Sequence, residues 1–336
     1  MITVLAGRLD VRTRAFAVED VPTPRPGPGE VLVKVEAAGV CLSDAHLVDG
    51  TLTPPYLSGY TVTLGHEVSG VVAEPGGGVT CWRPGQRVLL QTGEEHGDAV
   101  RTRGVDCDGG WAEYAVASES ALVELPDDLP FEQAAIIPDA VSTPWAAITT
   151  TARAEPARPA GVWGAGGLGA HAVQLLRLVG AAPVVAVDPL PEARERALAF
   201  GADAALPPDD PELPARVRAE AGGAGLAVAF DFAGVPAVRE QAVACLARGG
   251  RLVLVGPVDG PLTIGDGTAF SRLGQQVLGH HGSTGVHVRQ LVSLARLHRL
   301  ELSKSVSGVL PLTEAREAVD RLLQKEGNPV RLILRP

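Results

Sequence analysis

The 336-residue sequence has little cysteine and few aromatic residues. Its four cysteines, Cys41, Cys81, Cys107 and Cys245, are widely spaced and include no Cys-x-x-Cys pair. Four thiols can form too few disulfides to stabilise a chain of this size. This argues against a disulfide-rich secreted domain and favours a reducing, cytoplasmic location. Aromatic residues make up only 4% of the chain, so aliphatic side chains must build most of the core.

A basic excess and long apolar runs are also missing. The formal net charge is −10, whereas a surface that binds nucleic acid or an anionic membrane needs a basic footprint. Every apolar stretch is shorter than the roughly 18 residues of a membrane span, and the first one is interrupted by Arg8 and Asp10. We therefore expect no signal peptide, no membrane anchor and no nucleic-acid partner, but a small-molecule partner.

The length of the chain predicts two domains, because single hydrophobic cores stop growing at roughly 250 to 300 residues. A change in the hydrophobic pattern along the chain agrees with this. Short β-branched runs separated by Pro-Gly turns fill the first third, which predicts irregular antiparallel β structure. From Arg158 onward, short apolar strands alternate with amphipathic helices, the pattern of βαβ units around a parallel sheet. Two further helical patterns and a last strand follow residue 285.

A glycine-rich turn stands between a predicted strand and a predicted helix. Gly164, Gly166 and Gly169 have the G-x-G-x-x-G spacing that lets backbone approach a pyrophosphate at a helix N-terminus. Asp188 follows nineteen residues after Gly169, at a predicted strand end where a ribose 2′-hydroxyl would lie. The next four residues contain no arginine to receive a 2′-phosphate, so NAD is favoured over NADP. The candidate cofactor-binding turn comprises Gly164, Gly166, Gly167, Leu168 and Gly169.

Three other segments carry possible metal ligands. Cys41 lies in the stretch GVCLSDAH, His66 and Glu67 are neighbours in TLGHEVSG, and Asp139 lies in IIPDAVSTPW, just before a predicted helix start at Ser142. Taken separately, each has an ordinary alternative: a buried apolar thiol, a surface His-Glu pair, and an acid at a helix N-terminus. The residues alone leave these alternatives open.

Together, the motifs resemble the zinc-dependent medium-chain alcohol dehydrogenases. GVCLSDAH, GHEVSGVV, PGQRV, DGGWAEYAV, the acid of IIPDAVSTPW, GAGGLG and NPVRLILRP occur in that family's order and spacing, over nearly the whole chain. The resemblance implies an α/β protein with a GroES-like, irregular β catalytic domain in residues 1–143 and 286–336. A Rossmann domain with a doubly wound parallel sheet, residues 144–285, is inserted into it, with zinc in the cleft.

The resemblance also implies one catalytic zinc per chain. Cys41 and His66 are then ligands, and Asp139 takes the third place, where the family most often has cysteine but a bacterial secondary-alcohol branch has aspartate. Glu67 matches a neighbouring glutamate that can bind the metal when water or substrate leaves. Thiolate, imidazole and carboxylate suit zinc, and three protein ligands leave a position for an alcohol. Asp44 is the expected acceptor for the ring N–H of His66.

The implied reaction is hydride transfer between a carbinol carbon and nicotinamide, with zinc as the Lewis acid that lowers the alcohol's pKa. Ser43 matches the family's relay hydroxyl, which passes the alcohol proton through the cofactor ribose toward His46. Thr143 matches a residue beside the nicotinamide. Val255 and Gly256 are expected to complete the cofactor site.

Two positions depart from the family pattern. Relatives with a second, structural zinc hold it with four closely spaced cysteines, but residues 91–110 offer Cys107 alone, with scattered Glu94, Glu95, His96 and Asp98. We therefore expect a shortened lobe without metal. Leu42 stands where many relatives place a basic residue facing the pyrophosphate.

The substrate and the assembly are less defined by the sequence. The expected reactants are an alcohol and its ketone or aldehyde, with a secondary or cyclic alcohol favoured. A homodimer or homotetramer is also expected, with residues 251–264 and 275–281 as candidate contact strands. Alternatives are a zinc-free quinone or enoyl reductase of the same superfamily and a catalytically silent cofactor-binding protein. The candidates to line an apolar substrate pocket are Leu47, Tyr56, Tyr60, Trp111 and Trp145.

Overall fold

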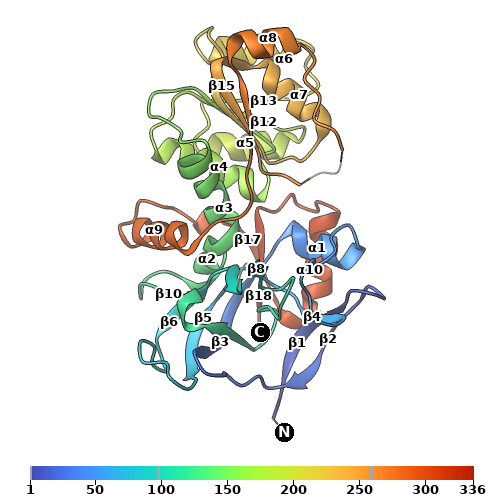
Figure 1. The fold of residues 1–336 in the computed structure, drawn as a ribbon, viewed down its shortest axis with the longest axis vertical. Helices are drawn as coiled ribbons and strands as arrows, with labels where there is room; N and C mark the ends of the chain where they lie inside the picture. Colours follow the sequence, from blue (N-terminus) through green and yellow to red (C-terminus); the bar gives the residue numbers. More distant parts are fainter. Residues whose placement is uncertain (1, 97–98, 258–259) are drawn as a thin grey trace. The chain divides into compact units, whose positions relative to one another are not determined.

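A computed structural model describes residues 2–96, 99–257 and 260–336. The chain forms two compact units (Figure 1). The first, here the outer unit, comprises Met1–Ser142 and Ser283–Pro336, and the second, here the middle unit, comprises Thr143–Gly282. These divisions fall close to the predicted boundaries at 143/144 and 285/286.

The outer unit is built mainly from antiparallel strands. Its strands are β1 (Thr3–Asp10), β2 (Ala15–Pro22), β3 (Glu30–Val40), β4 (Thr61–Thr63), β5 (Val68–Pro75), β6 (Arg87–Leu90), β7 (Gly93–His96), β8 (Ala99–Thr102), β9 (Tyr114–Ser118), β10 (Leu122–Glu124), β17 (Val306–Pro311) and β18 (Arg331–Arg335). Its helices are α1 (Leu42–Asp49), α2 (Phe131–Ala135), α9 (Gly285–Arg296) and α10 (Ala315–Leu323), with a π-helical turn η2 (Ile137–Val141) and 3₁₀ turns η1 (Glu119–Ala121), η4 (Ser303–Ser305) and η5 (Leu312–Glu314).

Strand β3 organises the outer unit. Within the described residues, it lies in a seven-stranded sheet of order β10-β6-β5-β3-β18-β17, with β9 also paired to β3. Figure 1 shows the blue β3 and the red β18 meeting in this sheet, where they pair antiparallel with Leu332 opposite Val40. The last strand of the chain therefore lies beside the residue that precedes Cys41.

The middle unit is an α/β domain with a parallel sheet. Its elements are β11 (Ala160–Trp163), α4 (Gly167–Leu178), β12 (Val184–Val187), α5 (Pro191–Ala199), β13 (Ala204–Leu206), α6 (Leu213–Glu220), β14 (Leu226–Asp231), α7 (Pro236–Ala244), β15 (Leu246–Leu254), α8 (Gly267–Leu273) and β16 (Gln276–Gly279), preceded by α3 (Ser142–Ala146), which starts in the outer unit, and a π-helical turn η3 (Ala147–Thr151).

The described strands of this sheet are parallel and follow the order β13-β12-β11-β14-β15-β16. All four residues of β11 and of β12 are buried, as strands covered by helices on both faces require. The strand order reverses between β11 and β14, which is the point where a doubly wound sheet opens a ligand crevice at its carboxyl edge. The predicted GroES-like plus Rossmann architecture is confirmed.

No helix in the described ranges is long and apolar enough to cross a membrane.

Candidate active site

Cys41 lies at the junction of β3 and α1, where it is the N-cap residue of the helix. Its backbone N–H donates to Asp44 Oδ2 at 2.9 Å, the side-chain bond that caps a helix start. The residue is only 6% exposed. The cap fixes the backbone of Cys41, so the direction of its thiol is set by the strand-to-helix turn.

His66 lies in the connection between β4 and β5 and is 3% exposed. Its Nδ1 lies 3.3 Å from Asp44 Oδ1, and its Nε2 lies 3.5 Å from Asp139 Oδ2. Burial lowers the pKa of His66, but Asp44 and the other acidic neighbours outweigh burial and raise that pKa well above its usual value. Asp44 thus contacts both Cys41 and His66. Because Asp44 lies at Nδ1, the other ring nitrogen of His66, Nε2, is the one that faces Asp139.

Asp139 occupies a π-helical turn between α2 and α3. The sequence suggested a helix that starts at Ser142, but the helical segment already starts at Phe131. The turn includes Pro138, which lacks the N–H that a regular α-helix needs. Because the π-helical turn is wider than an α-helical turn, the N–H of Ala140 can bond to a side chain from another segment. It donates to Glu67 Oε1 at 2.9 Å. A local departure from the α-helix thus presents Asp139 and ties its turn to the His-Glu pair.

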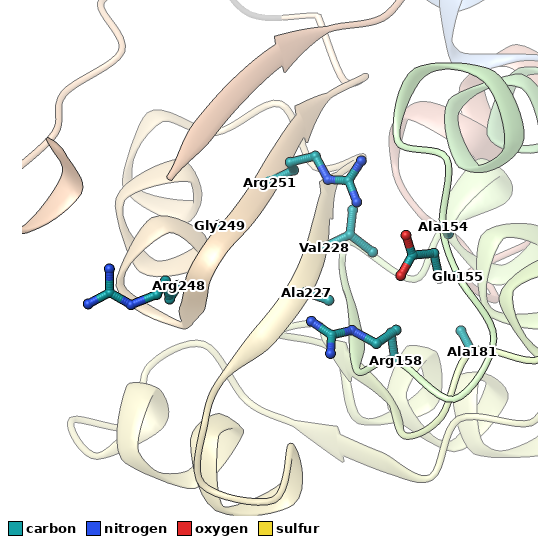
Figure 2. Close-up of a pocket in the computed structure, with 9 residues that line it drawn as sticks. All are labelled: Ala154, Glu155, Arg158, Ala181, Ala227, Val228, Arg248, Gly249 and Arg251. Atoms are coloured by element: carbon teal, nitrogen blue, oxygen red, sulfur yellow. The ribbon is translucent and has the colours of Figure 1, made fainter. Parts of the chain in front are cut away.

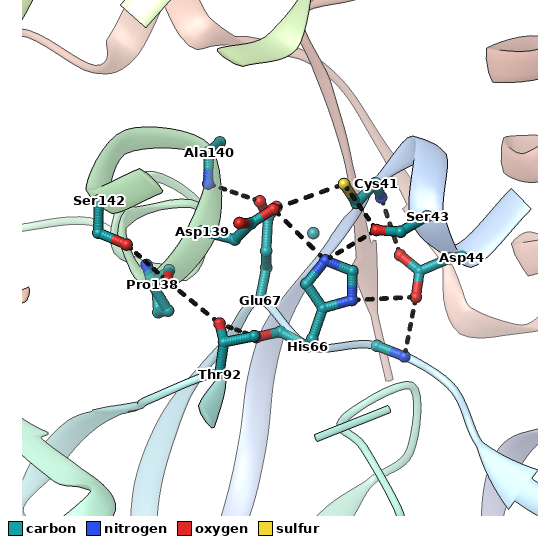
Figure 3. Close-up of polar contacts among 12 residues, drawn as sticks. Cys41, Ser43, Asp44, His66, Glu67, Thr92, Pro138, Asp139, Ala140 and Ser142 are labelled. Atoms are coloured by element: carbon teal, nitrogen blue, oxygen red, sulfur yellow. Dashed lines mark hydrogen bonds and ion pairs between the residues drawn. The ribbon is translucent and has the colours of Figure 1, made fainter. Parts of the chain in front are cut away.

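The three predicted ligands come together in the outer unit (Figure 3). One donor atom from each of Cys41, His66 and Asp139 lies within 4.8 Å of the other two, and Cys41 Sγ is 3.5 Å from Asp139 Oδ2. Donors bound 2.0 to 2.3 Å from one tetrahedral zinc lie roughly 3.3 to 3.8 Å apart. The spacing and the chemistry of the donors therefore fit zinc.

Glu67 is fully buried, and its carboxylate pairs with Arg331. Arg331 Nε and Nη2 donate to Glu67 Oε1 at 3.1 and 2.9 Å. Burial raises the pKa of Glu67 to about 7, although Arg331 opposes that shift. In the described residues the group suited to a metal comprises Cys41, His66 and Asp139, and Glu67 as a further ligand stays a prediction.

Arg331 is a site residue that the motifs did not reveal. It is the first residue of β18 and 2% exposed. Its Nη2 also lies 3.4 Å from Cys41 Sγ and 3.5 Å from Asp139 Oδ2. Burial alone lowers the pKa of Arg331, but these acidic neighbours raise it. The one available signal was a charged residue inside the apolar stretch PVRLIL, since arginine is rarely buried unless it is paired.

Ser43 and His46, the predicted relay pair, lie on α1. Ser43 Oγ donates to Cys41 Sγ at 3.2 Å and lies 3.5 Å from His66 Nε2 (Figure 3). His46 follows one turn later and is partly exposed. The structure brings Ser43 to the ligand cluster, whereas no hydrogen bond joins Ser43 directly to the imidazole of His46 in the described residues.

The lobe of residues 91–110 contains a hairpin of β7 and β8 held by a buried ion pair. Arg103 is 1% exposed and pairs with Glu94. Its Nη1 donates to the carbonyl of Val116 at 2.8 Å. A buried ion pair thus links β7 to the residue that follows β8.

Cys107 lies in the same lobe, with its Sγ 3.9 Å from the carbonyl of Thr102. Asp98 and the side chain of His96 lie outside the described residues. In the part of the chain that the structure describes, only Cys41, His66 and Asp139 form a three-residue group suited to a metal. The metal-free lobe stays a prediction.

The glycine-rich turn of the middle unit has the geometry of a dinucleotide loop. Gly164 has φ +88°, and a Cβ there would lie 2.9 Å from the backbone nitrogen of Ala233. A Cβ at Gly169 would collide with the carbonyl of Gly164, whereas Gly166 faces open space. The three glycines thus serve the turn, the helix packing and the backbone approach that a pyrophosphate needs. The residues fit a dinucleotide.

Asp188 follows β12 and is 7% exposed. Its Oδ2 accepts from the N–H of Ala165 at 2.8 Å, so the carboxylate is tied to the glycine-rich turn. Two arginines of α5 reach the same place: Arg194 donates to the carbonyl of Asp188 at 2.8 Å, and Arg196 to that of Ala165 at 2.7 Å. Residues 189–192 contain no arginine, as the preference for NAD assumed, but α5 brings these two later arginines to the turn. The choice of NAD over NADP stays a prediction.

Two of the five candidate pocket residues belong to the core instead. Leu47 and Trp111 are fully buried in the hydrophobic core of the outer unit. Trp111 Nε1 donates to the carbonyl of Gly39 at 3.0 Å. Tyr56 and Tyr60 are more than half exposed, so they remain candidates for substrate contact.

A small pocket of about 40 Å³ in the middle unit lies away from these motifs (Figure 2). That volume has room for only a few water molecules and is far too small for a dinucleotide. Its lining residues are Ala154, Glu155, Arg158, Ala181, Ala227, Val228, Arg248, Gly249 and Arg251.

Two protein families match the chain: the alcohol dehydrogenase GroES-like domain over residues 27–127 and the zinc-binding dehydrogenase over residues 167–296. An alcohol dehydrogenase from Geobacillus stearothermophilus is 32% identical over 331 residues, which cover 94% of this chain and 95% of that protein. The chain therefore belongs to the alcohol dehydrogenases of the medium-chain dehydrogenase/reductase superfamily, as its motifs predict. It is an oxidoreductase.

Solved structures agree with this family membership. A putative zinc-binding dehydrogenase from Sinorhizobium meliloti, bound to NADP, has a TM-score of 0.91 and 26% identity, with 100% of both chains covered. The 2R,3R-butanediol dehydrogenase from Bacillus subtilis has a TM-score of 0.90 and 26% identity, with 99% of both chains covered.

Proposed function

We propose that this protein is a zinc-dependent, NAD-linked dehydrogenase that interconverts a secondary or cyclic alcohol and its ketone. The observation that carries the proposal is the buried cluster of one thiol, one imidazole and one carboxylate, with donor atoms within 4.8 Å of one another. Three protein ligands of this kind leave a fourth zinc position for substrate. Zinc bound there would supply a Lewis acid that favours loss of the alcohol proton.

The residues around the cluster have separate tasks in this proposal. Cys41, His66 and Asp139 hold the metal. Asp44 orients His66 from its far side, at 3.3 Å from Nδ1. Arg331 holds Glu67 beside the ligands and balances part of their negative charge.

The middle unit is proposed to bind NAD. The turn from Gly164 to Gly169 receives the pyrophosphate and Asp188 the adenosine ribose, while Thr143, Val255 and Gly256 contact the nicotinamide half. Residues 144–285 form this nucleotide-binding domain, and residues 1–143 with 286–336 form the catalytic domain. Leu42 is 45% exposed and offers the pyrophosphate no charge.

The names of relatives support the proposed substrate class. Relatives are named for alcohol and for 2R,3R-butanediol, whose hydroxyls are on secondary carbons. A panel of primary, secondary and cyclic alcohols assayed with NAD, and of ketones, quinones and enones assayed with NADH, tests the proposal. Turnover of secondary or cyclic alcohols supports it. Reduction of quinones or enones alone would favour the zinc-free reductase, and no turnover with bound cofactor would favour a silent binding protein.

Cofactor choice is predicted to depend on the charge of Asp188. The parent enzyme should prefer NAD over NADP in kcat/KM by about tenfold or more, since the carboxylate repels a 2′-phosphate. Asp188→Asn, which removes the charge but keeps one acceptor for the Ala165 N–H, should narrow that ratio. Arg194→Ala should lower the rate with NADP more than the rate with NAD. A parent enzyme that prefers NADP would contradict the assignment.

The proton path is predicted to start at Ser43. Ser43→Ala should lower kcat about 10²-fold, because general-base assistance is lost while water replaces it in part. His46→Gln should cost less, since solvent reaches that side chain. The kcat values of both variants from about pH 6 to 9, with their zinc content and NADH affinity, test the roles of Ser43 and His46. Parent rates for Ser43→Ala across this range would refute the relay.

A homodimer or homotetramer is proposed through the edge of the parallel sheet. Strand β16 is the last strand of the sheet, and among the described strands it pairs with β15 alone. Its outer edge therefore offers unpaired backbone groups to a second copy. Residues 258 and 259 of the other candidate strand lie outside the described residues. A cytoplasmic location is proposed because all four cysteines are unpaired.

A further inference from the structure

Asp231 and Arg239 form a buried ion pair in the middle unit that has no part in the roles proposed so far. Asp231 ends β14 and is fully buried, and Arg239 lies in the first turns of α7 and is 6% exposed. Arg239 Nε donates to Asp231 Oδ2 at 2.8 Å. Burying two charges is costly, and a cation near a helix N-terminus opposes the helix dipole. An ion pair at this buried position near the start of α7 therefore costs stability, and fold stability alone does not explain it.

The pair joins two turns that follow neighbouring strands. On the β15 side, Arg239 Nη2 donates to the carbonyl of Gly256 at 3.0 Å. On the β14 side, Asp231 Oδ1 accepts from the N–H of Gly234 at 2.9 Å. The carbonyl of Asp231 also accepts from the N–H groups of Val255 and Gly256, at 3.0 and 2.8 Å. One guanidinium and one carboxylate thus hold both turns in a fixed relation.

These two turns lie at the carboxyl edge of the sheet, next to the glycine-rich turn. Asp231 is in register with Trp163 of β11 on one side and with Leu254 of β15 on the other. A Cβ on Gly164 would lie 2.9 Å from the nitrogen of Ala233, so the glycine-rich turn packs against the turn after β14. In a doubly wound sheet each half serves one mononucleotide. With the adenosine proposed at Asp188 in the first half, the turns after β14 and β15 belong to the half that would take the nicotinamide.

We propose that Arg239 is a positioning residue that, through Asp231 and the Gly256 carbonyl, fixes the two turns holding the nicotinamide half of the cofactor. This inference rests on the proposed NAD-linked function. The two turns touch closely: a Cβ on Gly256 would lie 2.5 Å from the nitrogen of Gly234. Loss of the guanidinium would let the turn after β15 shift away from the turn after β14.

The test compares the affinities of NADH and ADP for the zinc-loaded parent and for Arg239→Met. ADP carries the adenosine and pyrophosphate but no nicotinamide, so it reports the first half of the site alone. We expect the Kd of NADH to rise on the order of tenfold, as for one lost charged hydrogen bond, while the Kd of ADP stays within about twofold. Arg239→Lys keeps the positive charge but loses the forked guanidinium group. Its Kd for NADH should therefore lie between those of the parent and Arg239→Met.

Two further variants separate positioning from folding. Arg251→Met removes an arginine of the same unit that lines the small pocket near the amino end of β14 (Figure 2), and it should change neither Kd. The double variant Asp231→Leu/Arg239→Met removes both buried charges, which is often tolerated by the fold. Its melting temperature should exceed that of Arg239→Met, yet its affinity for NADH should stay low.

Three results would overturn the proposal. Equal weakening of NADH and ADP in Arg239→Met would show that the arginine only holds the domain together. Parental NADH affinity in Arg239→Met, or in the double variant, would show that the network does not position the cofactor. A parent protein that binds neither NADH nor ADP would instead refute the proposed function itself, and this inference with it.

Discussion

Replacement of Cys41 by alanine is expected to remove the zinc ion and to lower kcat/KM by about 10³-fold or more, the loss of several kcal/mol of Lewis-acid stabilisation. The thiol is one of three donors in the cluster and is 6% exposed. The helix cap fixes the backbone of Cys41, so alanine would place only a methyl group there and supply no donor atom. Zinc content by elemental analysis and kcat/KM on the same preparation measure the two effects.

Cys81→Ala is the matched control for this experiment, because Cys81 is exposed and lies outside the cluster. It should keep the metal and the parental rate. The parent should contain one zinc per chain, since the lobe of residues 91–110 is held by the Glu94–Arg103 pair rather than by four thiols. Two zinc ions per chain would contradict the metal-free lobe, and full zinc in Cys41→Ala would contradict the ligand assignment.

Replacement of Arg331 by methionine is expected to lower the free energy of unfolding by about 3 to 5 kcal/mol, the usual cost of leaving one member of a buried pair uncompensated. The guanidinium is 2% exposed and holds the fully buried Glu67 carboxylate through Oε1 at 2.9 Å. Without it, the Glu67 carboxylate, Cys41 and Asp139 would lie together with less positive charge. Urea unfolding of the parent and the variant measures the loss.

A neighbour on the same strand provides the control. Arg335 pairs with Glu132, but its side chain is 61% exposed, so Arg335→Met should cost far less. The double variant Glu67→Gln/Arg331→Met should recover much of the lost stability, because neither side chain then carries an unpaired charge. If Arg331→Met unfolds at the same urea concentration as Arg335→Met, Arg331 does not compensate the buried acids.

The fold was predictable because its signals are local. Alternating apolar strands and amphipathic helices indicated the parallel sheet of the middle unit, and the G-x-G-x-x-G spacing located the turn before α4. The helix around Asp139 was placed less well. Ser142 was the predicted helix start, whereas the helical segment starts at Phe131 and continues through Pro138 in a π-helical turn. Periodicity cannot show such a turn, because it is stabilised by a contact with Glu67 from another segment.

The sequence by itself determined which residue types are available and in what order: a thiol, an imidazole and a carboxylate at Cys41, His66 and Asp139, and glycines where backbone must approach an anion. Motifs carry this information because local spacing fixes local geometry. Only the tertiary structure decided which charges face one another. Arg331 reaches Glu67 across 264 residues, and α5 folds Arg194 back onto Asp188. The same holds for Trp111, whose place in the core depends on Gly39, 72 residues away. Burial and ion pairing depend on distances between segments remote in sequence, and no local pattern encodes those distances.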